Sequence, residues 1–226
     1  MGNRLINRLL PLVQVQRALF FEYGWLRSWW KGKPLDRAGE PLPTLTYPAI
    51  DFISQFDFSE ASVFEWGSGV STLWWSRHCR RITTVDPNTE FIPYLQPLLT
   101  SDLDCPSTSF DTSAEVEALL TRQLPVHDVI IIDNNGPFRW RCAEAATKHL
   151  ADGGIIILEN SDQCLKACKV LRDAGLTEID FSGFSPSNAH THTTSLFFRG
   201  WLKFRIADAP QPHRSPAQPN PPWSNC

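Results

Sequence analysis

The order of apolar and polar positions from Val63 to Asp86 predicts a strand, a turn, a helix and a second strand. The first strand ends at Glu65, and Gly67–Gly69 then turns the chain, because glycine allows backbone dihedrals that other residues avoid. Ser71–His78 predicts a short helix with an inward apolar face, and Arg81–Val85 predicts a strand that delivers the aspartate at its carboxyl end. Such a unit is half of a nucleotide-binding fold.

Helical and strand-like patterns continue to alternate along the rest of the chain. They predict helices at 48–56, 90–99, 112–124 and 161–174, a helix from about Arg139 to a stop at Gly153 and Gly154, and strands at 107–110, 126–133, 155–158, 178–183 and 191–199. The last two strands are joined by a short connection, so we expect them to be antiparallel, since a parallel return requires a long crossover. The chain therefore predicts an α/β fold: a Rossmann-like, doubly wound sheet that is mostly parallel, with a reversed C-terminal strand.

The first 45 residues contain a separate amphipathic pattern. Apolar residues recur at steps of three and four, which predicts a helix from Leu12 to Lys31 that begins after Pro11 and stops at Gly32 and Pro34. Charged residues within it, such as Arg17, argue against a membrane span.

This helix has two interpretations. The segment from Arg4 to Lys33 has six basic residues and one acidic residue, and it is rich in Phe and Trp. This composition is compatible with peripheral contact to an anionic membrane or to a protein. The alternative is a helix that packs on the main domain and covers its ligand side. We favour packing, because an apolar helical stripe is usually core.

Composition sets the outer limits. A chain of 226 residues with 42% apolar content can bury one substantial core, so we expect an N-terminal helix and linker at 1–45, a main domain at 46–206 and a disordered proline-rich tail at 207–226. A net charge of −3 argues against a nucleic-acid binder that depends on overall basicity. Six scattered cysteines without a C-x-x-C pair, and no signal-peptide pattern, favour a reduced, cytoplasmic location.

The glycine turn narrows the ligand class. Gly67 and Gly69 fit a dinucleotide fingerprint, but Thr72 occupies the position of its third glycine. Glu65 two residues before the turn, and Asp86 after the next strand, complete a pattern that resembles the Rossmann-like (class I) S-adenosylmethionine-dependent methyltransferases. The resemblance spans about residues 47–199, and its C-terminal part looks like that of uncharacterised bacterial methyltransferase-like proteins.

The resemblance implies roles for these residues toward S-adenosylmethionine. Glu65 would help to hold the methionine end, Gly67 and Gly69 would pass close to the ribose and methionine, and Asp86 would accept the ribose hydroxyls. Asp111 occupies a place where the family often binds the adenine amino group, although a carboxylate at the start of helix 112–124 has a structural explanation too. Ser71 departs from a third glycine found in many members.

The carboxyl ends of the predicted strands bring further acids together. In a doubly wound sheet Asp133 should meet Glu65 and Asp86 in one crevice, so we interpret Asp133 as the catalytic base or orienting group. Asp133, Glu159 and Asn160 also resemble the magnesium ligands of catechol-type O-methyltransferases. We favour the simpler reading, in which Asn160 or Ser161 caps the next helix and no metal is bound.

His190 and His192 would share one face of the last strand. No carboxylate or cysteine stands beside them in the sequence at metal-binding spacing, so one of them is retained only as an alternative base near neutral pH.

These patterns predict an S-adenosylmethionine-dependent methyltransferase that acts on an oxygen or nitrogen of a small molecule. One alternative is a non-catalytic descendant that serves as a binding or scaffold protein through its N-terminal helix. The other is an NAD-dependent oxidoreductase, which Thr72 and the reversed terminal hairpin disfavour.

Overall fold

A computed structural model gives the structure of the chain, and it describes residues 2–86, 103–104, 124–134, 138–208 and 215–217. The predicted helix at 90–99, strand at 107–110 and nearly all of helix 112–124, as well as Asp111, lie outside the described residues. Most of the predicted disordered tail does so too, and that expectation remains a prediction.

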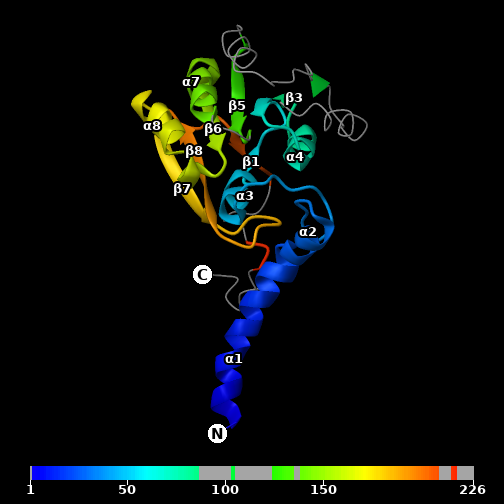
Figure 1. Cartoon of the computed structure of the whole chain (residues 1–226). Coiled ribbons are helices and arrows are strands. Elements are labelled where there is room, and N and C mark those ends of the chain that lie inside the picture. Colours follow the sequence, from blue (N-terminus) through cyan, green and yellow to red (C-terminus); the bar gives the residue numbers. More distant parts are fainter. Residues whose placement is uncertain (1, 87–102, 105–123, 135–137, 209–214, 218–226) are drawn as a thin grey trace.

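One seven-stranded sheet organises the described part of the chain (Figure 1). Its order is β4-β3-β2-β5-β6-β8-β7, with every pair parallel except β6 with β8 and β8 with β7. In chain order the strands are β2 (Ser62–Trp66), β3 (Arg81–Val85), β4 (Leu103–Asp104), β5 (His127–Ile132), β6 (Leu150–Leu158), β7 (Thr177–Gly183) and β8 (His192–Phe198). The predicted mostly parallel sheet with a reversed terminal strand is therefore confirmed.

Helices cover both faces of this sheet, which explains why its central strands are apolar without interruption. Side chains alternate across the sheet, so Val129 and Ile131 enter one core while Ile130 and Ile132 enter the other. The first core also contains α3 (Tyr47–Ile53) and α4 (Val70–His78); the second contains α7 (Arg139–His149) and α8 (Leu165–Asp173). A small antiparallel pair, β1 (Phe56–Asp57) with β9 (Arg205–Ile206), lies outside the main sheet.

The glycines at 153 and 154 lie inside a strand, whereas the sequence pattern placed them at a helix end. Helix α7 ends at His149, and β6 begins at once with Leu150. A Cβ on Gly154 would lie 2.7 Å from the Asp128 carbonyl oxygen, so this glycine allows close backbone approach next to a register shift in β5.

The helix predicted at 161–174 is also divided. A 3-10 turn, η3 (Ser161–Gln163), comes first, and α8 begins only at Leu165. The helix expected at 48–56 is shorter than predicted, because α3 ends at Ile53 and Phe56 already belongs to a strand.

The N-terminal helix differs most from expectation. It begins at Gly2 as α1 (Gly2–Arg17), continues through a π-helical turn, η1 (Ala18–Glu22), and stops before α2 (Trp25–Lys31). Gly24 breaks it with φ +76°, and a Cβ there would lie 2.4 Å from the Asp36 carbonyl carbon. Leu19, Tyr23 and Trp25 pack against the core as expected, but α1 projects away from the body (Figure 1). No helix in the described segments is long and apolar enough to span a bilayer.

We predict that Phe197→Ala in β8 lowers the free energy of unfolding by about 3–5 kcal/mol, because it empties a fully buried site between β6 and β7. Chemical denaturation measures this change. The matched control Phe21→Ala removes a phenyl ring that is 60% exposed, and its cost should stay below about 1 kcal/mol. Equal losses in the two variants would contradict the central position of β8.

Candidate active site

A cleft of about 740 Å³ opens at the carboxyl ends of the parallel strands. Four acidic residues line it, one at the end of each of four strands: Glu65 within the last pleat of β2, Asp86 after β3, Asp133 after β5 and Glu159 after β6. The structure therefore brings together Glu65, Asp86 and Asp133, which the sequence predicted to converge, and Glu159, which the sequence grouped with Asp133 only in the metal alternative. Further lining comes from the glycine turn, from Gly32, Pro34 and Thr44 of the N-terminal segment, and from Pro186, Ser187 and Asn188 of the hairpin connection.

The two glycines of the turn differ: position 67 requires glycine, whereas position 69 has room for a side chain. Gly67 has φ +98°, and a Cβ there would lie 2.8 Å from the Asp133 carbonyl oxygen, so only glycine fits without strain. Gly69 has an extended backbone, and its Cβ would meet no atom within 4 Å. Backbone at Gly69 is therefore accessible from the cleft.

Glu65 is fully buried behind this turn. Its Oε2 accepts a 2.5 Å hydrogen bond from Thr72 Oγ1, which in turn accepts one from the Gly69 amide at 3.0 Å. Its other oxygen, Oε1, is buried and has no hydrogen-bond partner among the described residues. Burial raises the pKa of Glu65 to about 8; the Thr72 hydrogen bond opposes this shift and the nearby charge of Asp133 adds to it.

Asp86 fixes the other side of the turn. Its Oδ2 accepts hydrogen bonds from both the amide and the hydroxyl of Ser68, at 2.5 and 2.7 Å. The aspartate is therefore held at the end of β3 with its carboxylate against the glycine turn, where a ligand in the cleft can reach it.

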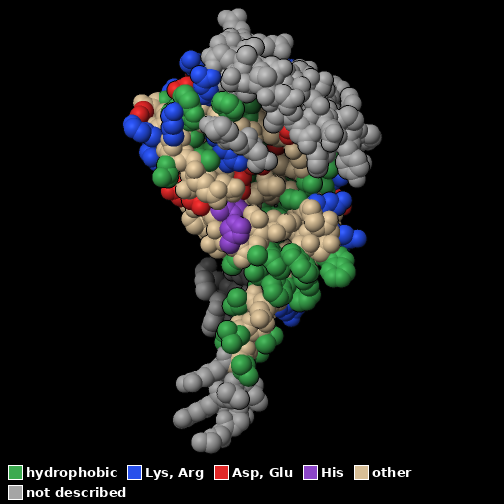
Figure 2. All heavy atoms as spheres, in the orientation of Figure 1, with side chains coloured by type: hydrophobic (Ala, Val, Ile, Leu, Met, Phe, Trp, Pro, Cys, Tyr) green, Lys and Arg blue, Asp and Glu red, His purple; other side chains and the backbone are tan. Residues whose placement is uncertain are grey.

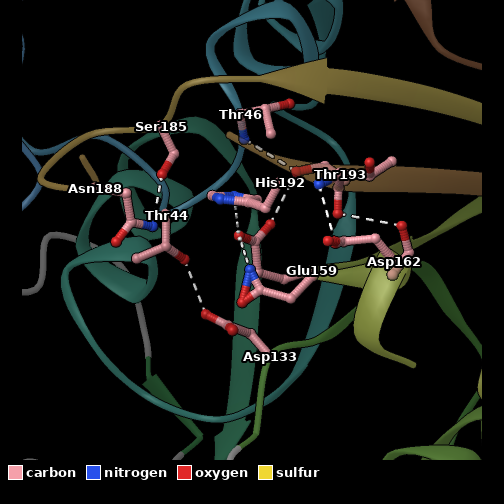
Figure 3. Close-up of polar contacts among 12 residues, drawn as sticks. Thr44, Thr46, Asp133, Glu159, Asp162, Ser185, Asn188, His192 and Thr193 are labelled. Carbon is pink, nitrogen blue, oxygen red and sulfur yellow. Dashed lines mark hydrogen bonds and ion pairs between the residues drawn. The ribbon is translucent and has the colours of Figure 1, made fainter. Parts of the chain in front are cut away.

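Asp133 lies between two partners from distant parts of the chain. Thr44 Oγ1 donates to its Oδ2 at 2.8 Å (Figure 3), and the Arg139 guanidinium lies 3.4 Å from its Oδ1. Burial and the charge of Glu159 raise the pKa of Asp133, and these effects outweigh Arg139, Thr44 and His192. A quarter of its side chain remains exposed, which leaves the carboxylate available to the cleft.

Glu159 has a buried histidine behind it (Figure 3). His192 Nε2 lies 2.8 Å from Glu159 Oε1, and Thr194 Oγ1 donates to Oε2 at 2.9 Å. Burial disfavours the charged imidazole, but the contact with Glu159 and the charges of nearby acids outweigh it and raise the pKa of His192. Because its side chain is 1% exposed and does not line the cleft, His192 positions Glu159 and does not act as the substrate's base. His190 is exposed.

The capping role that we favoured for Asn160 and Ser161 is wrong. Asn160 Nδ2 donates to Glu159 Oε1 at 3.1 Å, and Ser161 Oγ donates to the Thr193 carbonyl at 3.1 Å. The chain forms a 3-10 turn after β6, which directs both side chains away from the α8 amino end.

The three residues of the metal alternative, Asp133, Glu159 and Asn160, all make contacts within the protein. Elsewhere among the described residues, no group of three His, Cys, Asp or Glu side chains is placed to hold a metal ion. Asp133 and Glu159 instead contact protein donors, and the Asn160 amide points its NH₂ group at Glu159.

Sequence reasoning missed the partners that orient these acids: Thr44, Thr72, Arg139, Thr194 and the burial of His192. Thr72 had a local signal, since it lies three residues after Gly69 at the start of a helix, where a side-chain oxygen commonly accepts a hydrogen bond from a free backbone amide. Thr44, Thr194 and His192 are more than 30 residues from the acid that they contact, so only the tertiary fold brings them there. Arg139 is six residues from Asp133, but no sequence motif marks that contact.

The sheet order, the strand directions and the position of the cleft define a protein with the Rossmann-like fold of class I methyltransferases. No protein-family model matches the chain, and no curated protein matches it in sequence. Solved structures do match. A methyltransferase from Pyrococcus furiosus is 17% identical, with a TM-score of 0.50 over 88% of this chain and 100% of its own. A precorrin-6y methyltransferase from Geobacter metallireducens is 14% identical, with a TM-score of 0.51 over 66% of this chain and 87% of its own. At these identities the likeness establishes the fold.

The raised pKa of Glu65 generates a stability prediction. A carboxyl whose folded pKa is about 8, against an ordinary value of 4.5, keeps its proton in the folded protein while the unfolded chain loses it. The contribution of this group to the free energy of unfolding is thus largest below pH 4.5 and decreases as the pH rises toward 8. We expect Glu65→Gln to gain stability relative to the parent protein across that window, as measured by denaturation at several pH values. The control Glu144→Gln, at an exposed position on α7, should show no such trend. A pH-independent difference for Glu65→Gln would contradict the assignment.

Proposed function

We propose that the chain binds S-adenosylmethionine in the cleft and transfers its methyl group to an oxygen or nitrogen of a small molecule. The observation that carries the proposal is the buried Glu65 carboxyl, whose Oε1 has no partner among the described residues and which lies under an open glycine turn in a fold of methyltransferases. A buried polar atom without a partner is costly, and a ligand donor would satisfy it.

The residues present fit this cofactor. S-adenosylmethionine carries an ammonium and a sulfonium group, and a cleft lined by four carboxyl groups suits a cationic ligand. Glu65 would accept the amino group at the methionine end, and Asp86 would accept the ribose hydroxyls. Gly67 and Gly69 would form the adjoining wall, where Gly69 leaves its backbone accessible.

The bound cofactor would supply an already activated methyl group, so the protein needs chiefly to align it with the acceptor. Asp133 is the group that we assign to the acceptor, as base or orienting residue. Its raised pKa brings it closer to neutral, where a carboxylate is a more effective proton acceptor. Thr44 and Arg139 would hold its carboxylate in one orientation during the transfer.

The expected location is the cytoplasm. The cysteines that the structure describes, at positions 79, 142, 164 and 168, are free, which supports a reducing compartment. We assign no nucleic acid to the cleft, because its lining is acidic and would repel phosphates.

Calorimetric titration with S-adenosylmethionine and S-adenosylhomocysteine tests the cofactor. We expect micromolar binding, weakened about tenfold or more by Asp86→Asn, since a hydrogen bond to a charged group contributes about 1.5–3 kcal/mol. Asp173→Asn on the exposed face of α8 is the matched control and should bind as the parent protein does. Absence of binding at millimolar cofactor would refute the enzyme and favour a scaffold role. Preferential binding of NAD would assign the cleft to an oxidoreductase.

The two glycines of the turn should separate folding from binding. Gly69→Ala adds a methyl group in open space, so its free energy of unfolding should stay within about 1 kcal/mol of the parent value. Its affinity for the cofactor should fall by about tenfold or more, because the methyl group occupies the wall of the cleft. Gly67→Ala should instead destabilise the fold by about 1–3 kcal/mol through backbone strain. Undiminished cofactor affinity in Gly69→Ala would place the ligand elsewhere.

A further inference from the structure

The protruding helix α1 exposes the apolar side chains that the structure describes in it. Every described side chain of α1, from Leu9 to Arg17, is exposed, and Leu9, Leu12 and Val13 lie on one face at helical spacing. Figure 1 shows this helix extending away from the sheet, with the N-terminus at its far end. Exposed aliphatic residues in a row are uncommon on a monomer and indicate contact with another apolar phase.

A hydrophobic surface continues from α1 over α2 (Figure 2). Trp29 and Trp30 are 55% and 77% exposed, and Trp25 stacks on Trp29 with ring centroids 6.5 Å apart. A shallow groove of about 570 Å³ lies among these rings. Its lining is mainly aromatic and basic: Phe20, Phe21, Gly24, Leu26, Arg27, Trp29, Trp30, Lys31 and Arg37.

Charge is divided between this segment and the rest of the chain. The first 40 residues contain seven basic residues (Arg4, Arg8, Arg17, Arg27, Lys31, Lys33 and Arg37) and three acidic ones (Glu22, Asp36 and Glu40). The whole chain has 21 Lys and Arg against 24 Asp and Glu, so the remainder is acidic. The segment that carries the exposed apolar residues is therefore also the one that an anionic surface attracts.

We propose that α1, η1 and α2 dock on an anionic lipid surface, with Leu and Val side chains of α1 in the acyl boundary and Trp29 and Trp30 at headgroup level. Tryptophan prefers this interface, because its ring is apolar and its N–H is polar. Basic residues next to an apolar helix add attraction to anionic lipid. A second copy of the chain fits less well as the occupant, since two segments of the same positive charge repel each other.

Vesicle flotation of the full chain tests the proposal without any measurement of methyl transfer. We expect at least about tenfold more protein on vesicles of phosphatidylcholine with phosphatidylserine than on phosphatidylcholine alone, and a fall at high salt, which screens surface charges. Leu12→Ser with Val13→Ser, and separately Trp30→Ser, should each reduce vesicle binding several-fold, since all three side chains are more than half exposed and make no core contact.

Matched controls are available on other surfaces. Leu165→Ser on α8 removes a leucine that is 69% exposed, and Trp201→Ser removes a tryptophan that is 66% exposed; both variants should float like the parent protein. Equal binding to neutral and anionic vesicles, equal loss in the controls, or no flotation would overturn the proposal. So would dimerisation or single-stranded RNA binding that is lost in the α1 and Trp30 variants while flotation is unaffected.

Discussion

Burial of acidic side chains close to one another is the constraint around which the site is built. Parallel strands end at the same edge of a sheet, so the acids at the carboxyl ends of β2, β3, β5 and β6 share one cleft. Burial raises the pKa of both Asp133 and Glu65; the charge of Glu159 adds to the rise at Asp133, and the charge of Asp133 adds to the rise at Glu65. A cationic ligand would interact favourably with these carboxyl groups, so the acidic lining of the cleft favours a ligand of that charge.

Each acid is stabilised in a different way, which makes the four sites chemically distinct. Burial raises the pKa of Glu65 to about 8, although its hydrogen bond from Thr72 opposes the rise, whereas a buried histidine lies beside Glu159. The partners are Thr72 for Glu65, Ser68 for Asp86, Thr44 and Arg139 for Asp133, and Thr194 and His192 for Glu159. Groups with similar intrinsic acidity can thereby take separate roles in one cleft.

The sheet could be predicted from the sequence because its signals are local and strong. The apolar run at 126–133 and the strand–turn–helix at 63–86 lie within one or two residues of β5, β2, α4 and β3. Their carboxyl ends then placed Glu65, Asp86 and Asp133 together by topology alone. Element boundaries near glycine were less accurate. A pair of glycines such as Gly153 and Gly154 can end a helix or can allow another backbone to approach a strand closely. The Asp128 carbonyl beside Gly154 shows that the second applies here, and this contact cannot be seen in the sequence.

The N-terminal region could not be predicted in the same way, because its spacing is compatible with one long helix. The pattern of apolar residues gives the period of a helix but not the surface against which it packs. The need for glycine at position 24 comes from the Asp36 backbone, which leaves no room for a Cβ and is brought there by tertiary structure. The stripe that we interpreted as core divides into a packed part at Leu19 and Tyr23 and an exposed part at Leu12, Val15 and Trp30.

The linker that follows this helix belongs to the site as much as to the appendage. Thr44 donates to Asp133, and the Thr46 amide donates to Thr194, which itself holds Glu159. The expected domain boundary after residue 45 therefore falls within a segment whose hydrogen bonds orient two of the four acids. Gly32 and Pro34 of the same segment also line the cleft, so the residues that follow α2 form part of its wall. A surface that binds α1 and α2 would consequently bind next to the opening through which ligands reach the acids.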